Sequence, residues 1–379
     1  MLSPILFTQY LIDRKITFFT GVPDSLLKQF CFYISSGENQ NITHITANSE
    51  GSAISLAMGH YLASGYPALV YMQNSGIGNA LNPLISLADN DVYGIPMVLL
   101  IGWRGKPNTD DEPQHVKQGK ITKSLLETAG ITTYELTENE IEKTIDNAVN
   151  YTIKNNQPVA LIASKNFFDE YKNIKSDTNK YQLKREEAIE ILLKNIPDND
   201  RIVSTTGMIS REIYEIREKY DQNHSNDFLC VGGMGHASQI AIAIAIEQPE
   251  KNIYCFDGDA AFLMQMGGVS QTALLQPKNF VHIILNNSAH DSVGGQDTVG
   301  NLVDITKVAE GFGYKTIFST DKKDELLEIS QKIENLKKPA FIEVKVSKGA
   351  RKNLGRPPRY MHKAKIDFMQ ELILPTHPN

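Results

Sequence analysis

The stretch NIYCFDGDAAF, from Asn252 to Phe262, is the clearest single indicator of fold class in this chain. NIYCF has the apolar and aromatic character of a short buried strand, and a helical pattern begins just after Asp257, Gly258 and Asp259. FVHIILNN, from Phe280 to Asn287, is a second apolar run that ends in polar residues. In open parallel sheets, ligands collect at the carboxyl ends of strands, where helix N-termini offer unpaired N–H groups. We therefore expect a binding site at these two strand ends.

The same succession of a strand-like run and a helical pattern extends over the whole chain, with one interruption. The apolar runs are ITFFTG, ITHITA, ALVYMQ, MVLLIGW and PVALIA in the first half, and RIVSTTG, the run that begins FLCVGG, NIYCF, FVHIILNN and AFIEVKV in the second. The polar stretch from Asp169 to Lys184 separates the two halves. Such alternation predicts parallel sheets covered by helices on both faces. We expect an α/β protein with two domains, residues 1–170 and 185–379, joined by a linker over residues 171–184.

Composition argues against several classes of function. The 379 residues carry a formal net charge of -6 and a pI near 5.9, whereas general nucleic-acid binding needs a broad excess of lysine and arginine. The N-terminal residues lack the features of a signal peptide, and no window approaches an apolar stretch of membrane-spanning length. We expect a cytoplasmic protein that binds neither nucleic acid nor membranes. Its cysteines, Cys31, Cys230 and Cys255, stand far apart in apolar contexts and are expected to be buried thiols.

An aspartate and an asparagine stand at the two strand ends. The oxygens of Asp259 and Asn287 together suit Mg²⁺, which prefers octahedral oxygen coordination and leaves positions for a diphosphate. The same residues have a simpler explanation, in which Asp259 caps the next helix and Asn286 and Asn287 form a turn. Spacing alone does not separate these two interpretations.

A glycine-rich loop, VGGMGHAS, runs from Val231 to Ser238 before a helix of small residues. It resembles a dinucleotide fingerprint only weakly, because the last glycine is missing. A nucleotide-binding Rossmann protein also needs an acid about 20 residues further on to bind the ribose. That region offers Asp257 and little else. A core methionine, Met234, beside a tight turn is the simplest interpretation of the loop.

Glu50 is a lone carboxylate at the start of a helix of small and apolar residues, within ITANSEGSAISLAMG from Ile45 to Gly59. A surface helix would surround its glutamate with lysine, arginine and more glutamate. We therefore expect this helix to be buried along most of its length. A carboxyl group in apolar surroundings is suited to acid–base chemistry. The alternative is that Glu50 only interacts with the helix dipole.

The two strand ends also resemble a known motif. GDA from Gly258 to Ala260, followed by the asparagine pair that ends at Asn287, is similar to the metal and diphosphate motif of thiamine-diphosphate enzymes. That motif begins Gly-Asp-Gly, so Ala260 departs from it, although a methyl group is tolerated if the residue has negative φ. The resemblance implies thiamine diphosphate and Mg²⁺ as cofactors. It implies that Asp259 and Asn287 are Mg²⁺ ligands and that the carbonyl of Ala289 is a third.

The resemblance gives roles to the glutamate and the glycine loop. Family members use a glutamate to hydrogen-bond the aminopyrimidine of the cofactor, which implies this role for Glu50. A bulky apolar residue in the loop keeps the cofactor bent, which implies cofactor contacts for Gly233, Met234, Gly235 and His236. The halves of two different subunits meet at each cofactor in this family. The chain is therefore expected to form a homo-oligomer, at least a dimer, with active sites between subunits.

Two further polar residues of the first half are similar in place to catalytic residues of 2-keto acid decarboxylases. These are Asp24 in GVPDS and His115 in DEPQH. A proton relay is the role that the resemblance implies for both. The alternatives are a helix cap for Asp24 and an ordinary loop histidine for His115.

Five stretches together look like the phosphonopyruvate decarboxylase family: TGVPDSLLKQF, MQNSGIGNALNPLISL, GWRGKPNTDDEPQH, NNSAHDSVGGQDT and RKNLGRP. The resemblance implies two thiamine-diphosphate-binding domains, each a mostly parallel sheet flanked by helices, with no middle domain. It implies decarboxylation of 3-phosphonopyruvate to phosphonoacetaldehyde, the precursor of 2-aminoethylphosphonate. Sulfopyruvate decarboxylase is the nearer alternative, and a Rossmann protein without decarboxylase activity is the more distant one.

A basic segment near the C-terminus suits a small anionic 2-oxoacid substrate. From Lys345 to Lys365 the chain carries eight lysine and arginine residues and no acid, inside an otherwise acidic protein. Arginine side chains match phosphonate oxygens in geometry and charge. The family motif falls on Arg351, Lys352 and Arg356, which are therefore the expected substrate-binding residues. The alternative is a solvated C-terminal tail.

Overall fold

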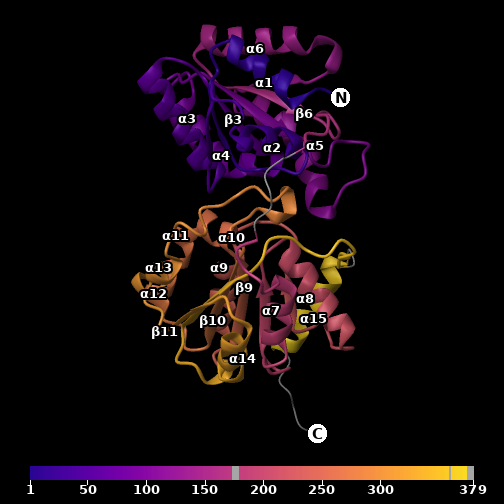
Figure 1. The fold of residues 1–379 in the computed structure, drawn as a ribbon, viewed down its shortest axis with the longest axis vertical. Coiled ribbons are helices and arrows are strands. Elements are labelled where there is room, and N and C mark those ends of the chain that lie inside the picture. Colours follow the sequence, from indigo (N-terminus) through magenta and orange to yellow (C-terminus); the bar gives the residue numbers. More distant parts are fainter. Residues whose placement is uncertain (173–178, 358–359, 374–379) are drawn as a thin grey trace. The chain divides into compact units, whose positions relative to one another are not determined.

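The chain forms two compact units, which the computed structural model describes over residues 1–172, 179–357 and 360–373 (Figure 1). Unit 1 spans Met1–Asp177 and unit 2 spans Thr178–Asn379. The predicted linker contains residues 173–178, which lie outside the described residues. Its last residues belong structurally to unit 2, because Tyr181 donates a hydrogen bond to Asn301 at 3.0 Å and Lys184 pairs with Ser347.

Unit 1 is built on a six-stranded parallel sheet in the order β2-β1-β3-β4-β6-β5. The strands are β1 (Phe18–Gly21), β2 (Thr43–Thr46), β3 (Ala68–Gln73), β4 (Met97–Gly102), β5 (Thr132–Glu135) and β6 (Val159–Ala163). The helices are α1 (Pro4–Asp13), α2 (Lys28–Ser36), α3 (Glu50–Ser64), α4 (Ile77–Pro83), α5 (Pro113–Thr128) and α6 (Ile141–Asn155). One apolar core packs α1, α2 and α6 on one face of the sheet, and another packs α3, α4 and α5 on the opposite face.

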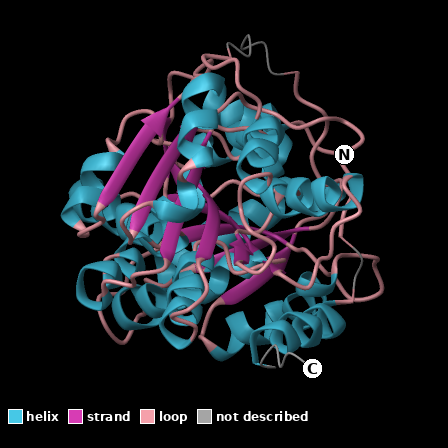
Figure 2. Cartoon of the chain, turned by 90° about the horizontal axis from the view of Figure 1, so that it is seen from below, coloured by secondary structure: helices cyan, strands magenta, loops and turns pink. Residues whose placement is uncertain are grey.

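Unit 2 repeats this plan with the sheet order β11-β12-β10-β9-β7-β8, and all of its pairings are again parallel. The strands are β7 (Arg201–Ser204), β8 (Asp227–Leu229), β9 (Ile253–Gly258), β10 (Phe280–Asn286), β11 (Thr316–Thr320) and β12 (Ala340–Lys345). The helices are α7 (Arg185–Leu193), α8 (Met208–Lys219), α9 (Ala237–Glu247), α10 (Asp259–Met264), α11 (Met266–Val269), α12 (Gln271–Leu275), α13 (Ile305–Gly311), α14 (Lys323–Gln331) and α15 (Met361–Ile373). Figure 2 shows the strands enclosed between helices.

The expected α/β class with two sheet-containing halves is therefore confirmed. Two strands were not predicted, the edge strands β5 and β11. Their residues are mostly half-buried, whereas β4, β6 and β10 are buried throughout. An edge strand contacts the core through fewer side chains, so its sequence lacks the continuous apolar run that identifies a central strand.

Parallel pairing brings the carboxyl ends of the central strands together in each unit. In unit 1, Gly102 at the end of β4 pairs with both Gln73 and Ala163. In unit 2, Leu285 of β10 pairs with Gly258, the last residue of β9. The loops that follow these strands therefore lie side by side.

Two other expectations concern the chain as a whole. All three cysteines are buried and free, as expected. None of the described helices combines the length and the apolar character that crossing a bilayer requires.

Candidate functional site

Glu50 is the first residue of α3 and a buried carboxylate, with 6% of its surface exposed. The helix is capped by the preceding residue, Ser49, whose hydroxyl accepts a hydrogen bond from the N–H of Ser52 at 3.3 Å. Oε2 of Glu50 accepts a hydrogen bond from Nδ2 of Asn79 on α4 at 2.9 Å. The position in the first turn also agrees with a favourable interaction with the helix dipole.

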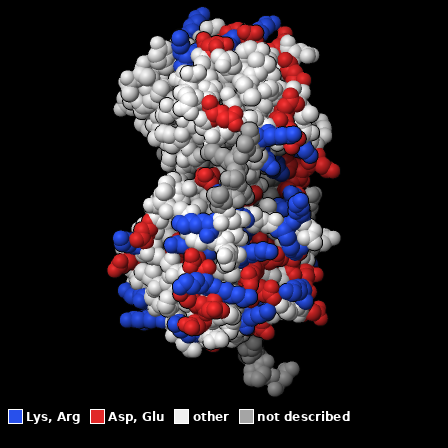
Figure 3. Space-filling view, viewed as in Figure 1, with Lys and Arg blue, Asp and Glu red and all other residues white. Residues whose placement is uncertain are grey.

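Helix α3 differs from the expectation that it is buried along most of its length, because only one of its faces packs on the core. The buried face consists of Glu50, Ala53, Ile54, Ala57 and Met58. The opposite face is exposed and uncharged, and includes Ser52, Ser55, Leu56, Gly59 and Leu62. The sequence contains no lysine, arginine, aspartate or glutamate between Glu50 and Asp89, and Figure 3 shows a broad uncharged surface over this part of unit 1. The small residues of α3 therefore form an uncharged surface as well as a core.

Asp24 lies between β1 and α2 and is fully buried. Its Oδ2 accepts a hydrogen bond from the N–H of Leu26 at 3.1 Å, while Oδ1 has no partner within the described part of the chain. Burial raises the pKa of Asp24 to about 6, although the positive charge of Arg104 opposes this effect. Helix α2 begins only at Lys28, with Leu27 in the cap position, so Asp24 is not its capping residue. A carboxyl group with such a pKa can take up and release a proton near neutral pH.

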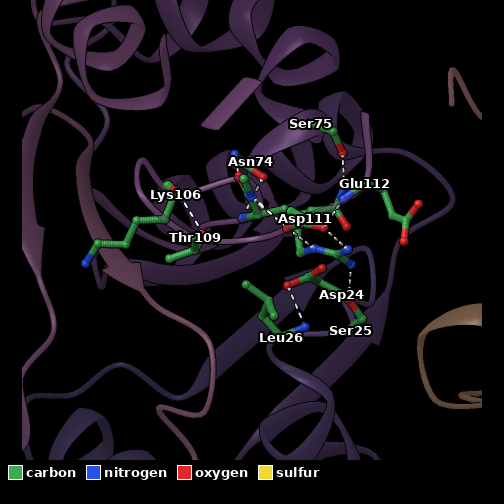
Figure 4. A network of polar contacts seen from close by, with 12 residues as sticks. Asp24, Ser25, Leu26, Asn74, Ser75, Lys106, Thr109, Asp111 and Glu112 are labelled. Atoms are coloured by element: carbon green, nitrogen blue, oxygen red, sulfur yellow. Dashed lines mark hydrogen bonds and ion pairs between the residues drawn. The ribbon is translucent and has the colours of Figure 1, made fainter. Parts of the chain in front are cut away.

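His115 lies in the first turn of α5 and is half-buried. Burial lowers its pKa, the charge of Arg104 adds to this effect, and Asp111 opposes it. Arg104 therefore acts on both His115 and Asp24, although the sequence did not single it out. Figure 4 shows Asp24, Ser25 and Asp111 within one polar network, in which Arg104 Nη1 donates to the Ser25 hydroxyl at 2.8 Å. The available signal was the presence of an arginine and several acids within GWRGKPNTDDEPQH.

In unit 2, the structure brings Asp259 and Asn287 together. Asp259 is the first residue of α10 and is 1% exposed. Burial raises its pKa to about 6, while hydrogen bonds from the Thr298 hydroxyl and from backbone N–H groups, including that of Asn287, oppose this effect. Oδ1 of Asn287 accepts from the N–H of Ala289 at 3.1 Å, and Ala289 is also buried. Asn287 thus stabilises the turn that the simpler interpretation predicted, and it does so beside the carboxylate.

A buried ionic network lies next to Asn287 and was not predicted. Arg185 forms a bidentate pair with Glu212 at 2.8 and 3.0 Å and contacts Asp291 Oδ2 at 2.7 Å. The same Asp291 oxygen accepts a hydrogen bond from Nδ2 of Asn287 at 2.7 Å and from the N–H of Gly349 at 3.0 Å. These partners come from segments far apart in the sequence. REEAIEILL reads only as the charged start of a helix, so no local pattern indicates that its arginine is buried.

The glycine loop lies between β8 and α9, at a strand end of unit 2. Gly233 and Gly235 have φ values of 64° and 87°, in the left-handed region that favours glycine. Met234 between them is half-buried, and His236 is an exposed residue just before α9. Ala260, which departs from the Gly-Asp-Gly motif, is helical and does not have positive φ, so its methyl group causes no backbone strain there.

The expected substrate-binding segment is less positive than its sequence indicates. Nε of Arg351 contacts Glu186 at 2.9 Å, and its guanidinium also pairs with Glu215. Lys352 and Arg356 are exposed. Arg359, which belongs to the same basic segment, lies outside the described residues. The acids come from α7 and α8, so the charge of Arg351 is already engaged within unit 2.

Each unit matches one domain family. Residues 6–126, within unit 1, match the family described as "Thiamine pyrophosphate enzyme, N-terminal TPP binding domain". Residues 205–344, within unit 2, match "Thiamine pyrophosphate enzyme, C-terminal TPP binding domain". Between the two matches, the described residues form β5, α6 and β6 of unit 1 and α7 and β7 of unit 2, so no middle domain is evident there.

Curated relatives cover nearly the whole chain. A phosphonopyruvate decarboxylase of Streptomyces hygroscopicus is 30% identical over 372 residues, covering 94% of this chain and 90% of the relative. A second one, from Streptomyces viridochromogenes, is 29% identical over 364 residues, covering 90% of this chain and 88% of the relative. A sulfopyruvate decarboxylase of Methanosarcina acetivorans is 27% identical over 334 residues, covering 82% and 84% respectively.

Proposed function

Since the chain belongs to the thiamine-diphosphate-dependent decarboxylases of the phosphonopyruvate and sulfopyruvate type, and is therefore a carboxy-lyase, we propose that its substrate is 3-phosphonopyruvate. The products are phosphonoacetaldehyde and CO₂. The similarity to two phosphonopyruvate decarboxylases, at 30% and 29% identity over 94% and 90% of this chain, supports this substrate. The buried pair of Asp259 and Asn287 supports the cofactor chemistry. The pair carries the assignment of the cofactor site, because both side chains lie at the carboxyl ends of adjacent strands.

The donor set around Asp259 is suited to Mg²⁺. A carboxylate oxygen and an amide oxygen are the hard ligands that this ion prefers. The hydrogen bonds to Asp259 come from a hydroxyl and from backbone N–H groups rather than from a cationic side chain. A buried carboxylate without a cationic neighbour gains most from a divalent cation. We propose that Asp259, Asn287 and the carbonyl of Ala289 hold the ion.

Thiamine diphosphate is the cofactor that this site would hold together with Mg²⁺. The proposed contacts are Gly233, Met234, Gly235, His236, Gly258 and Ala260, which all lie at strand ends of unit 2. When bound, the cofactor supplies a carbon nucleophile for the keto group and accepts the electrons that CO₂ leaves behind. Glu50 would hydrogen-bond the aminopyrimidine, with Asn79 orienting its carboxylate. Asp24 and His115 would hold the proton that replaces CO₂.

We propose that a complete site takes residues from both units, and that these units belong to two chains of a homo-oligomer. The uncharged exposed face of α3, which begins at Glu50, supports this proposal. Large apolar side chains are exposed on α3 and after it, namely Leu56, Leu62, Ile85 and Tyr93. Contiguous exposed apolar surface on a protein marks an interaction site. A second copy of the chain would cover this surface.

The phosphonate group requires cations, and we propose Arg351, Lys352 and Arg356 for this role. The pairs of Arg351 with Glu186 and Glu215 mean that Arg351 would act within an existing ionic network. Sulfopyruvate carries a similar anion, so these residues do not distinguish the two substrates.

The proposal is tested by steady-state assays of the purified protein with both acids, in which a coupled reductase reports aldehyde formation. We expect kcat/KM to be about tenfold or more higher for 3-phosphonopyruvate than for sulfopyruvate. Activity should require added thiamine diphosphate and disappear when EDTA removes divalent cations. A preference for sulfopyruvate would replace the proposed substrate, and turnover of neither acid would contradict the proposal.

A further inference from the structure

The segment from Gly102, the last residue of β4, to Gly105 contacts two of the predicted catalytic residues of unit 1, Asp24 and His115. A Cβ atom at Gly102 would collide with the carboxylate of Asp24. A Cβ atom at Gly105 would collide with the backbone carbonyl of His115. Only glycine fits at both positions, so this stretch is in direct contact with Asp24 on one side and with the first turn of α5 on the other.

The backbone of this stretch is firmly held. Asn74, which is buried, donates from Nδ2 to the carbonyl of Arg104 at 2.8 Å and accepts from the N–H of Arg104 at 3.1 Å. The same Nδ2 also donates to the Thr122 hydroxyl on α5 at 2.9 Å. Nε1 of Trp103 donates to the carbonyl of Gly119, also on α5, at 2.8 Å. Arg104 is thus fixed at the point where β4 and α5 meet.

The Arg104 side chain is held by Asp111 in a two-point contact. Its Nε lies 2.8 Å from Oδ2 of Asp111, and its Nη2 contacts Oδ1. Asp111 also accepts hydrogen bonds from the N–H groups of Gly105 at 2.7 Å and Glu112 at 2.8 Å. The Arg104 side chain is 18% exposed, so the pair is largely shielded from water. A bidentate arginine–carboxylate pair in such a place fixes geometry as well as charge.

Arg104 is the cation that Asp24 and His115 share. The charged or titratable groups around Asp24 are Arg104 and the Cys31 thiol on α2, while those around His115 are Arg104 and Asp111. A neighbouring cation favours the ionised carboxylate and disfavours the protonated imidazole. Arg104 therefore lowers the pKa of both groups, and Asp111 counteracts its effect on His115.

We propose that Arg104 is a positioning residue for the decarboxylation. Its backbone lies between the two glycines that contact Asp24 and His115, and its side chain, paired with Asp111 and Ser25, sets the charge around these two residues. The inference rests on the proposed function, since only that function gives Asp24 and His115 a proton to transfer. Arg104 itself would not contact the reacting atoms. It would act through Asp24 and His115, which would contact them.

The test is the pH profile of kcat/KM for decarboxylation by the full-length holoenzyme, in variants of the Arg104–Asp111 pair. Arg104→Gln should lower kcat/KM about 10- to 100-fold at the wild-type optimum and move the profile to higher pH by about one unit. Asp111→Asn leaves the positive charge uncompensated, so its profile should move to lower pH. Arg104→Lys keeps the charge but not the two-point contact, and should lose rate without moving the profile. Guanidinium chloride at millimolar concentration should partly restore Arg104→Ala.

The matched control is Arg14→Gln, because Arg14, whose side chain is 14% exposed, also pairs with an aspartate of unit 1, Asp146, at 2.6 Å. This variant should leave both the rate and the pH profile unchanged. Opposite shifts in Arg104→Gln and Asp111→Asn cannot arise from general loosening of the fold. Unmoved profiles in these two variants, or no difference between Arg104→Gln and Arg104→Lys, would overturn the inference. Failure of the wild-type protein to decarboxylate either acid would instead contradict the proposed function, so the two failures are distinguishable.

Discussion

Unit 1 and unit 2 share one sheet topology and differ in the chemistry of their strand ends. Numbered within each unit, the strands follow the same spatial order, in which the first strand lies between the second and the third. In both units candidate site residues follow the carboxyl ends of strands: Asp24 and Glu50 in unit 1, and Asp259 and Asn287 in unit 2. The topology therefore determines where a site is built, and the loop residues determine what the site does.

The difference is clearest in two buried aspartates. Burial raises the pKa of both Asp24 and Asp259 to about 6. Asp24 has a cationic side chain nearby, that of Arg104, whereas Asp259 is contacted by the Thr298 hydroxyl and backbone N–H groups. A buried carboxyl group whose negative charge is offset by a nearby arginine suits proton transfer. A buried carboxyl group that lacks such a cation suits metal binding. Unit 1 is thus expected to control turnover and unit 2 to control cofactor affinity.

The largest effect is expected from Glu50→Gln, which tests the expected role of unit 1 in turnover. Loss of the carboxylate should lower kcat by roughly two to four orders of magnitude, because a neutral amide cannot take part in acid–base catalysis. Calorimetry should show nearly unchanged affinity for thiamine diphosphate, since the proposed diphosphate contacts lie in unit 2. Glu142→Gln is the control, because Glu142 is an exposed glutamate in the first turn of α6 and should leave kcat unchanged. Near-normal turnover of the Glu50 variant would refute its assigned role.

Asp259→Ala tests the expected role of unit 2 in cofactor affinity. Removal of this proposed Mg²⁺ ligand should weaken Mg²⁺-dependent binding of thiamine diphosphate about hundredfold or more. Asp304→Ala is the control, because Asp304 is an exposed cap of α13 in the same unit and its loss should affect stability alone. Calorimetry measures both variants at several Mg²⁺ concentrations. Unchanged affinity in Asp259→Ala would contradict the division of roles between the units.

The smallest effect concerns stability, where Asp24 and Asp111 of unit 1 are expected to act with opposite sign. Because burial raises the pKa of Asp24 from 3.8 to about 6, the folded state binds the proton more tightly than the unfolded state. The ionised group therefore lowers the free energy of unfolding. The loss develops between about pH 4 and 6 and reaches about 3 kcal/mol at higher pH. Asp24→Asn should remove this cost and raise the melting temperature at pH 8 but not at pH 4.

Asp111 is the comparison for this stability test. Hydrogen bonds from Arg104 and Gly105 outweigh the effect of burial and hold the pKa of Asp111 below its usual value. Its contribution to stability is therefore present above the unfolded-state pKa and is lost as the pH falls. Asp111→Asn should lower the melting temperature at pH 8 and have little effect in acid. Melting shifts of the same sign for Asp24→Asn and Asp111→Asn at pH 8 would contradict this account.

Much of the fold was accessible from the sequence, because central parallel strands are buried on both faces and appear as continuous apolar runs. β3, β4, β6, β9 and β10 were all identified in this way. Asp259 and Asn287 were found because each directly follows such a run. The edge strands β5 and β11 were missed, and the one-sided burial of α3 was misjudged. A run of small residues has the same composition whether it faces the core of one chain or forms an uncharged surface.

The amino-acid sequence alone established the α/β class, the two halves of the chain and the strand ends at which polar residues gather, since these depend on local order and apolar periodicity. The tertiary structure alone revealed the partners: Arg185 with Glu212 and Asp291, Arg104 beside Asp24, and Asn79 on Glu50. Such pairs join segments that are distant in the chain, and their strength depends on burial and on distances of a few ångströms. No local pattern of residues contains that information, because only the packing of the sheet and its helices brings the groups together.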